Sequence, residues 1–407
     1  MADADSPEGP GRRPQPVSRL SPARVLLAGA AALALAMGIG RFAYTPVLPA
    51  MQEATGFGAG TAGWIAGWNY LGYLLGALAA SLIAARESRY AVLLASIAAS
   101  IFTTAAMGFT SSVVPWCALR FLSGLASAGV LVISSAIVLE TLAQAQRPHW
   151  MGVHFSGVGI GIALSGLVVA LGVAHLDWRG LWIALAGVSA VLGLAALPLL
   201  RSQPVRPGAT AAAPSEHFHA GLLIASYFLE GLGYVVTGTF LVAIAKQMPE
   251  IGGAAEALWI AVGLAGAPST LLWSRLAQRW GAPAALVAAH LVQAAGIVLP
   301  VFSASLWVAV VAAVFFGGTF MGITAVIVGF GGRISAHPAR MIGLLTAAFG
   351  LGQMIGPVIA GWLAERQGGF DGALVLAAGA VVLGAVLIAL GRATSRASVS
   401  AARPRSP

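Results

Sequence analysis

The stretch Gly38-Ile39-Gly40, in the first apolar segment of the chain, recurs 193 residues later as Gly231-Leu232-Gly233. Four more pairs recur at nearly the same offset: Arg86 with Arg279, Gly124 with Gly318, Gly159-x-Gly161 with Gly350-x-Gly352, and Trp178-x-Gly180 with Phe370-x-Gly372. A constant offset over so many segments indicates an internal repeat. The sequence therefore predicts two parallel halves, an arrangement by which many carriers expose one central site to each membrane face in turn.

The composition indicates a protein that faces lipid over most of its surface. Of its 407 residues, 58% are hydrophobic and 9% are charged, too few charges to cover a soluble fold. Twelve apolar segments are long enough to cross a bilayer. We predict spans at Val25–Val47, Thr61–Ala85, Tyr90–Phe109, Val113–Leu139, Trp150–Ala174, Leu181–Leu200, Ala220–Ala245, Ala257–Leu276, Ala284–Phe302, Leu306–Phe330, Met341–Leu363 and Ala373–Gly391. The fold class is thus an all-α membrane protein with twelve transmembrane helices in two six-helix, pseudo-symmetric bundles.

Polar, Pro-containing segments divide the chain into five parts. We predict a disordered cytoplasmic tail over 1–22, an N-terminal six-helix bundle over 23–200, a cytoplasmic linker over 201–219, a C-terminal six-helix bundle over 220–391 and a cytoplasmic tail over 392–407. No cleavable signal pattern precedes the first span. Cys117 is the single cysteine, and no Cys/His cluster has metal-ligand spacing, so the sequence predicts neither a disulfide nor a metal or other cofactor.

The net charge of +9 follows membrane topology rather than a nucleic-acid partner. With the N-terminus in the cytoplasm, seventeen Arg residues fall in cytoplasmic segments, and the opposite face carries only Arg179, Lys246 and Arg366. This asymmetry is the positive-inside pattern, and it predicts that both termini are cytoplasmic.

Three motifs resemble those of the major facilitator superfamily (MFS), each in altered form. The loop Ser274-Arg-Leu-Ala-Gln-Arg279-Trp-Gly281 is similar to the Gly-x-Leu-Ala-Asp-Arg-x-Gly loop of that family, with Gln278 in place of the Asp. Arg120-Phe-Leu-Ser-Gly124 in span four resembles the Arg-x-x-x-Gly pattern of proton-coupled members. Gly352-Gln-Met-Ile-Gly356-Pro357 in span eleven resembles a Gly-Pro motif that the antiporter branch carries in span five.

A longer stretch in span one is more specific. Gly38-Ile-Gly-Arg41-Phe-Ala-Tyr44-Thr-Pro46-Val-Leu-Pro49-Ala-Met51-Gln52 resembles the opening signature of the YbfB/YjiJ-like bacterial branch, as does Tyr227-Phe-Leu-Glu230-Gly-Leu-Gly-Tyr234 in span seven. The resemblance runs over the whole membrane domain. It implies a secondary carrier in a bacterial inner membrane, usually working as a monomer, and it implies no particular substrate.

Ionisable residues inside spans mark the candidate site, because each costs about 2.5–3.5 kcal/mol in hydrocarbon even on an insertion scale. Arg41, Arg120 and Glu230 lie well inside predicted spans. We expect Arg41 and Arg120 to bind an anionic or carboxylate-bearing solute, since a guanidinium group suits bidentate carboxylate recognition. We expect Glu230 to carry the coupled proton, because burial favours a neutral carboxyl group and a nearby Arg favours a charged one.

Other polar and aromatic residues could complete the site. The predicted solute-binding set is Arg41, Arg120, Tyr44, Asn69, Tyr234 and Gln353, and further candidates are Trp64, Trp68, Tyr73, Tyr227, Thr237 and Thr319. Basic residues at cytoplasmic helix ends could hold one gate shut, namely Arg86, Arg89, Arg275 and Arg279. The same four residues could instead be ordinary membrane anchors. His290 is expected at the periphery of its bundle as a packed or hydrogen-bonded residue.

The sequence favours a proton-coupled transporter of a small organic solute, working by alternating access, over three rivals. A proton-driven efflux antiporter for a hydrophobic or cationic compound would use the aromatic residues and Glu230. A sensor that no longer transports would need a signalling domain, and a membrane enzyme would need a recognisable catalytic set. The three intramembrane charges could also form a purely structural ion pair between Glu230 and one of the two Arg residues.

Overall fold

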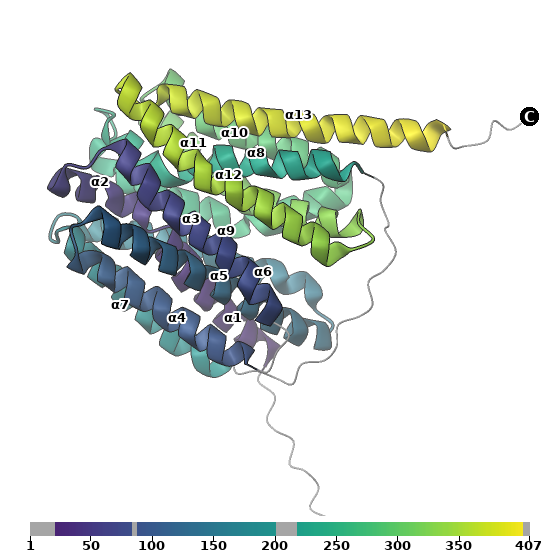
Figure 1. Cartoon of the computed structure of the whole chain (residues 1–407), viewed down its shortest axis with the longest axis horizontal. Helices are drawn as coiled ribbons and strands as arrows, with labels where there is room; N and C mark the ends of the chain where they lie inside the picture. Colours follow the sequence, from purple (N-terminus) through teal and green to yellow (C-terminus); the bar gives the residue numbers. More distant parts are fainter. Residues whose placement is uncertain (1–20, 84–87, 201–217, 402–407) are drawn as a thin grey trace, which may run out of the picture.

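The chain folds into a bundle of membrane-length helices, as the computed structural model in Figure 1 shows. The structure describes residues 21–83, 88–200 and 218–401. Within these ranges, twelve helical segments are long and apolar enough to cross a membrane, which confirms the all-α, twelve-span prediction. The predictions for most of the first tail, for Arg86 and for most of the linker lie outside the described residues.

The N-terminal half contains the first six spans. Its elements are α1 (Pro22–Leu33), η1 (Ala34–Arg41) and α2 (Tyr44–Thr55) in the first span, then α3 (Ala59–Ile83), α4 (Arg89–Ala106) with η2 (Met107–Phe109), α5 (Val113–Gln144), η3 (Pro148–Trp150) with α6 (Met151–Gly172), and α7 (Trp178–Ala196) with η4 (Leu197–Leu199).

The C-terminal half contains spans seven to twelve. Its elements are α8 (Ala220–Lys246), η5 (Gly252–Ala254) with α9 (Ala255–Trp280), α10 (Ala282–Phe302), α11 (Leu306–Arg333), α12 (Pro338–Gln367) and α13 (Asp371–Ala401). Helix α13 continues to Ala401, beyond the predicted last span, and its membrane-length apolar part is Asp371–Ala393. Residues 392–401 contain no Gly or Pro that would stop a helix.

The inner end of the molecule is defined here as the end where α1 begins and α13 finishes, and the outer end as the opposite one. These names follow the predicted orientation, with the termini in the cytoplasm. The spans cross between the two ends in alternate directions, so that α8 runs outward and α9 runs inward (Figure 1).

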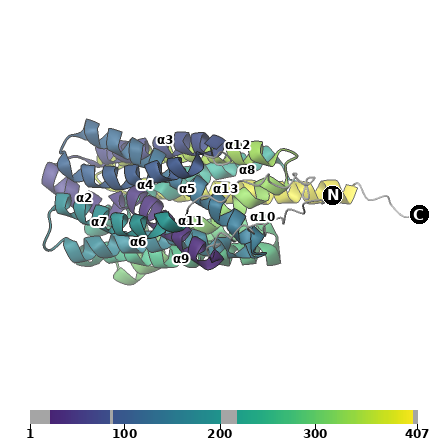
Figure 2. The same ribbon diagram turned by 90° about the horizontal axis from the view of Figure 1, so that it is seen from below.

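The two halves meet along two helix pairs that the repeat relates to each other. Span two (α3) lies against span eleven (α12), and span five (α6) lies against span eight (α9). Figure 2 shows these pairs on opposite sides of the molecule. Glycines allow the close approach: a Cβ atom on Gly159 would lie 2.3 Å from the backbone nitrogen of Ala267, and one on Gly263 would lie 2.2 Å from that of Ala163. The glycines of spans five and eight therefore allow close packing of the two helices.

The first span is broken in its middle. Its central segment η1 is a π-helix, and the Phe42 amide donates to the carbonyl of Met37, five residues earlier. Pro46 follows in the first turn of α2, where a missing backbone N–H costs least. Residues 42 and 43 form a turn between the two helical parts. The break leaves backbone carbonyls near Arg41 that need partners, and π-helical turns of this kind are frequent at functional sites.

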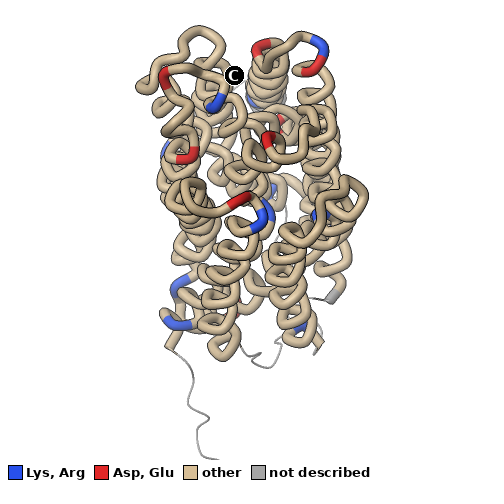
Figure 3. The backbone as a smooth tube through the Cα atoms, turned by 90° about the vertical axis from the view of Figure 1, so that its left-hand side faces the viewer, with Lys and Arg blue, Asp and Glu red and all other residues tan. Residues whose placement is uncertain are grey.

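Charged residues are sparse along the helices, as Figure 3 shows. Large apolar side chains cover the exposed flanks, including Leu82, Phe109, Phe302 and Trp307. Such a surface fits a surrounding of lipid tails rather than water. Buried hydrophobic residues from both halves form one continuous core cluster around the helices that line the centre.

Candidate functional site

The Arg41 guanidinium lies at the end of η1, buried to 3% exposure. Three aromatic rings surround it, with centroids 3.8 Å (Tyr73), 4.9 Å (Tyr70) and 5.4 Å (Phe42) from its central carbon. Such cation–π contacts are worth about 0.5–2 kcal/mol each, more when water is excluded. They lower the cost of burying the cation without neutralising its charge.

Gln353 on α12 connects Arg41 to the other half. Its Oε1 accepts a 2.9 Å hydrogen bond from Nη2 of Arg41. Its Nε2 donates to the hydroxyl group of Tyr234 on α8. Three residues of the predicted solute-binding set thus form one polar chain across the interface between the halves.

Arg120 has a different task from Arg41. Its two terminal nitrogens donate to the backbone carbonyls of Gly40 (2.8 Å) and Arg41 (2.5 Å), which the break in span one exposes. Ser123 also donates to the Gly40 carbonyl, at 2.8 Å. Arg120 therefore binds the end of η1 and fixes the direction in which Arg41 points.

Tyr44 and Asn69 support Arg120 rather than line an open chamber. The Tyr44 ring centroid lies 5.3 Å from the Arg120 guanidinium carbon, and its hydroxyl donates to the Ala62 carbonyl at 3.3 Å. Nδ2 of Asn69 donates to the backbone carbonyl of Arg120 at 2.8 Å, while its Oδ1 has no hydrogen-bond partner in the described structure.

The buried guanidinium groups have no acidic counter-charge. Among the described residues, the side-chain ion pairs are Arg89 with Glu140 and Lys246 with Glu256, and His290 lies near Glu230 and would pair with it only when its ring is protonated. Neither Arg41 nor Arg120 lies within ion-pair distance of a carboxylate in that part of the chain. The interface between the halves is therefore positively charged.

Glu230 faces the interior of the C-terminal half. Its Oε2 lies 3.8 Å from Nε2 of His290 on α10, and Gln293 of the same helix lies beside the carboxyl group. His290 is fully buried and its Nδ1 lies 2.8 Å from the Leu286 carbonyl, which confirms the prediction of a packed, hydrogen-bonded residue. The periodicity of α10 is ambiguous because the helix is apolar nearly all round, which hid this face from sequence analysis. An ion pair of Glu230 with either Arg residue does not occur in the described structure.

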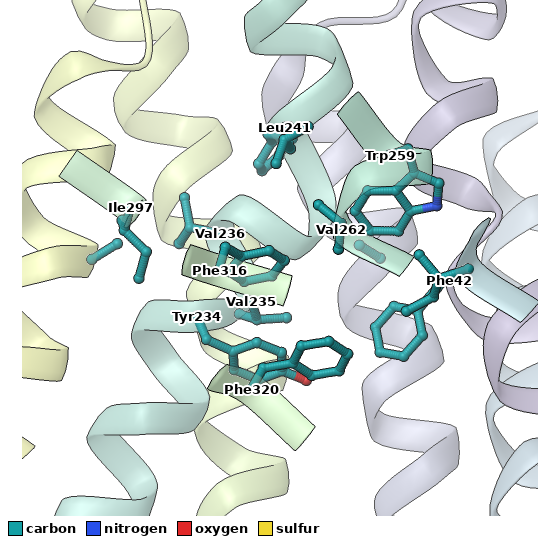
Figure 4. Packing of buried hydrophobic residues seen from close by; sticks show 14 of the residues in the cluster. Phe42, Tyr234, Val235, Val236, Leu241, Trp259, Val262, Ile297, Phe316 and Phe320 are labelled. Carbon is teal, nitrogen blue, oxygen red and sulfur yellow. The ribbon is translucent and has the colours of Figure 1, made fainter. Parts of the chain in front are cut away.

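Sequence analysis missed an aromatic cluster beside Arg41. The ring of Tyr234 stacks on Phe316, Phe320 and Phe349, with centroids 6.2, 6.0 and 5.5 Å away, and Phe42 meets Phe320 edge-on at 6.1 Å. Figure 4 shows Tyr234, Phe316 and Phe320 side by side, with Phe42 opposite them. The one available signal was the spacing of Phe316 and Phe320, four residues apart on one helix face.

The other candidates divide between the interior and the surface. Tyr227 stacks on Phe349 at 4.3 Å, and Tyr73 lies over Arg41. Thr319 is buried and bonds to carbonyls of its own helix, and Thr237 lies inside the C-terminal half. Trp64 and Trp68 are 58% and 40% exposed, which places them outside this cluster.

Of the predicted gate residues, Arg86 lies outside the described residues, and Arg275 and Arg279 form no ion pair with the N-terminal half in the described part of the chain. Arg89 donates two hydrogen bonds to Glu140, at 2.7 and 2.9 Å, within the N-terminal half. Arg275 and Arg279 are exposed at the inner end of α9. These positions fit membrane anchors as well as a gate in another conformation.

At the outer end, by contrast, polar contacts join the halves. Glu365, near the end of α12, accepts a 2.7 Å hydrogen bond from the backbone N–H of Gly60 at the start of α3. The Thr45 hydroxyl donates to the Gly238 carbonyl between α2 and α8. A carboxylate at a helix N-terminus is favourable for the helix dipole as well. The halves are therefore closed against each other on the outer side.

Comparison with known proteins agrees with this architecture. The model of a family described as "Uncharacterised MFS-type transporter YbfB" matches residues 33–389. A curated relative is the uncharacterised MFS-type transporter YceJ of Bacillus subtilis (strain 168), 28% identical over 143 residues. That match covers 35% of this chain and 36% of YceJ, about a third of each protein.

Solved structures share the fold at low sequence identity. A mutant of the nucleoside transporter NupG superposes with a TM-score of 0.72 at 15% identity, over 91% of this chain and 99% of NupG. A bacterial homologue of the human lysosomal transporter Spinster, solved in an inward-facing and unoccupied conformation, gives 0.66 at 16% identity, over 95% and 100%.

Proposed function

The chain belongs to the family of MFS-type transporters represented by YbfB, so it is a membrane transporter, and we propose that its cargo is a small organic anion whose carboxylate binds at Arg41. The transport is secondary, coupled to protons through Glu230, and proceeds by alternating access between the two halves. From the predicted set, Arg41 is the charged centre of the solute site with Gln353 and Tyr234 beside it, and Arg120, Tyr44 and Asn69 support it.

One observation carries the anion assignment: the buried guanidinium of Arg41 has no carboxylate partner among the described residues. An uncompensated buried charge is costly, and a bound carboxylate would compensate it with charge-assisted hydrogen bonds. The Nε of Arg41 has no hydrogen-bond partner in the described structure and is available to a solute oxygen.

The hydrogen bond between Arg41 and Gln353 could couple solute binding to movement of the two halves. Gln353 and Tyr234 belong to the C-terminal half, and Arg41 belongs to the N-terminal half. A carboxylate that competes for the guanidinium would replace a contact between the halves by one to the solute. Solute binding would therefore alter how strongly the halves hold together at the centre.

Arg120 acts as a positioning residue in this proposal. Because its terminal nitrogens are already bound to carbonyls of span one, it contributes positive potential and orientation rather than a free fork for the solute. This differs from the sequence prediction of two equivalent binding residues, and the two roles can be separated by mutation.

Proton coupling through Glu230 rests on its place on α8. Glu230 is one helical turn before Tyr234, so a change of charge at the carboxyl group acts on the helix that carries part of the solute site. A charged Glu230 requires compensation in the apolar interior, which protonation of the carboxyl removes. Packing of α8 would then depend on the proton.

The experiment uses purified full-length protein and thermal unfolding. Carboxylates are tested beside the amide and the amine of the same skeleton, which isolates the role of charge. We expect carboxylates alone to raise the melting temperature, Arg41→Gln to abolish the increase, and Arg275→Gln, the loss of an exposed Arg, to preserve it. Equal stabilisation by the uncharged amide would refute the anion assignment.

One observation supports the alternative function of an efflux antiporter. The stacked rings around Tyr234 could hold a flat apolar or cationic compound, as in a proton-driven efflux antiporter. In the same assay this function predicts stabilisation by amines that is lost in Glu230→Gln and retained in Arg41→Gln.

A further inference from the structure

A cluster of unpartnered polar side chains lies inside the C-terminal half. Ser226 and Glu230 on α8 and His290 and Gln293 on α10 are at most 1% exposed. Each has at least one polar atom without a hydrogen-bond partner in the described structure, including both amide atoms of Gln293. Buried polar groups are normally satisfied by protein or by ordered water. This cluster thus has the chemistry of a hydrated site.

The three helices around the cluster bring these groups together. The Nδ1 of His290 lies 2.8 Å from the Leu286 carbonyl and donates to it, which turns Nε2 towards Glu230 as an acceptor in the neutral ring. Gly384 on α13 completes the wall, since a Cβ atom there would be 3.3 Å from both the His290 ring and the Ser226 hydroxyl. His290 is therefore placed to share a proton with Glu230.

Few titratable groups surround this pair. His290 faces Glu230 from α10, and Tyr227 lies one turn away on α8 itself. Among the described residues of α9, α11, α12 and α13, none forms an ion pair with Glu230. His290 is therefore the titratable side chain best placed to exchange a proton with Glu230, and the rate of that exchange depends on how protons reach the pair.

A stripe of residues leads from the cluster to the outer end. At spacings of three and four, Thr237, Leu241, Ile244 and Met248 continue the face of Glu230 along α8 and the residues after it, and Gly296, Ile297 and Pro300 continue the face of His290 along α10. These residues line a narrow, mainly apolar cavity between the helices that offers about 20 Å³ to water, room for a single molecule.

The cavity continues into a wider opening at the outer surface. A second hollow, which offers about 320 Å³ to water, shares Ile244, Met248 and Pro300 with the first. Its rim includes Gln247 and the carboxylate of Asp371. An acidic group at the mouth raises the local concentration of cations, protons included.

Only a short gap separates the cavity from the cluster. Thr237 is seven residues beyond Glu230 on α8, about 10 Å along the helix. Gln293 lies in this gap, three residues from both His290 and Gly296 on α10. Its unpartnered amide can bind a water molecule from either side.

We propose that the interior of the C-terminal half is a water-bearing passage by which protons reach Glu230 and His290 from the outer membrane face. The passage is separate from the interface between the halves, where Arg41 lies and where Glu365 and Thr45 close the outer side. The inference rests on the proposed function only in taking Glu230 as the proton carrier.

Infrared difference spectroscopy of the full chain in lipid nanodiscs tests the passage with water as the probe. The C=O stretch of a protonated Glu230 is identified by its loss in Glu230→Gln, and its downshift is timed after transfer to D2O. Ala309→Leu, which fills the cavity, should slow this exchange at least tenfold. Ala79→Leu makes the same change at an exposed position of α3 and should leave the rate unchanged.

Thr237→Val provides a second test, because it removes the hydroxyl at the inner end of the cavity and keeps the side-chain volume. We expect slower exchange here as well, without loss of folding. A Glu230 band that exchanges at the wild-type rate in both Ala309→Leu and Thr237→Val would overturn the passage and leave the carrier role intact. Absence of any such band between pH 4 and 9 would overturn both.

Discussion

The guanidinium of Arg41 and the side-chain oxygen of Gln353, 312 residues apart in the chain, are joined by a 2.9 Å hydrogen bond between the two halves of the protein. The bond lies where spans one and eleven approach the centre, beside the Tyr234 hydroxyl. A charged donor is thus held by a neutral acceptor, a weaker partner than a carboxylate.

Replacing Arg41 by Lys should weaken binding of the carboxylate found in the thermal screen. Lys keeps the charge but loses the planar fork that binds both carboxylate oxygens. We expect a loss of about 1.5–3 kcal/mol, roughly tenfold to a hundredfold in Kd. Isothermal titration calorimetry measures this change in Kd. An unchanged Kd would show that the guanidinium fork does not bind the solute.

Replacing Arg120 by Gln should act on stability more than on selectivity. The variant loses charge-assisted bonds to the Gly40 and Arg41 carbonyls, at a cost of about 1.5–3 kcal/mol. Thermal unfolding should shift downward by more than in Arg41→Gln, because that variant loses its contacts but also removes a buried cation that no carboxylate compensates. If Arg120→Gln abolished carboxylate binding at full stability, Arg120 would be a binding residue and not a positioning residue.

Glu230→Gln should separate transport from its energy source. The amide has nearly the same shape as the protonated carboxyl group but cannot release a proton. In proteoliposomes we expect exchange of labelled solute across the membrane to persist, and accumulation driven by an imposed pH gradient to fall at least tenfold. Accumulation at the wild-type level would assign proton coupling to another group.

Glu365→Gln should favour opening at the outer end. The carboxylate accepts from the N–H of Gly60, and because it is exposed its loss costs only about 0.5–1 kcal/mol, a twofold to fivefold change in population. Thiol labelling of Tyr44→Cys in a Cys117→Ser background reports the change. Glu53→Gln, an exposed glutamate at the same end, is the matched control and should label as wild type.

Glu140→Gln should destabilise the N-terminal half. Arg89 is fully buried, so losing its carboxylate partner leaves a buried cation with weaker compensation, a cost of up to about 3 kcal/mol. The one-third exposure of Glu140 reduces this figure. A lower melting temperature with unchanged solute affinity is expected, and Arg279→Gln at an exposed position should have no effect.

The architecture could be predicted from the sequence because the length of the apolar segments and the internal repeat each depend on many residues together. Hydrophobic segments of the right length must cross the membrane, and the offset of Gly38 and Gly231 required six spans in each half. The last helix continues beyond the predicted span because residues 392–401 are polar but include no Gly or Pro to stop a helix. Polarity marks where the membrane ends, and it does not mark where a helix ends.

Sequence analysis located the three charged residues inside the spans but not all of the groups that they contact. The cost of burying charge identified Arg41, Arg120 and Glu230. Which group each contacts depends on the break in span one and on helix rotation, and neither follows from composition. Arg120 binds carbonyls that an unbroken helix would have used itself, and Glu230 meets His290 because both helices turn those faces inward.

The contact of Gly159 with Gly263 and Ala267 joins two backbones directly, with no side chains interleaved between them. At this contact the two helices can shift against each other without a change of side-chain rotamer. We expect resistance to opening to come instead from polar contacts, among them the 3.2 Å hydrogen bond from Nε1 of Trp259 on α9 to the Ser165 hydroxyl on α6. Gly159→Ala would add a methyl group to that smooth surface, and slower turnover at unchanged solute affinity would reveal it.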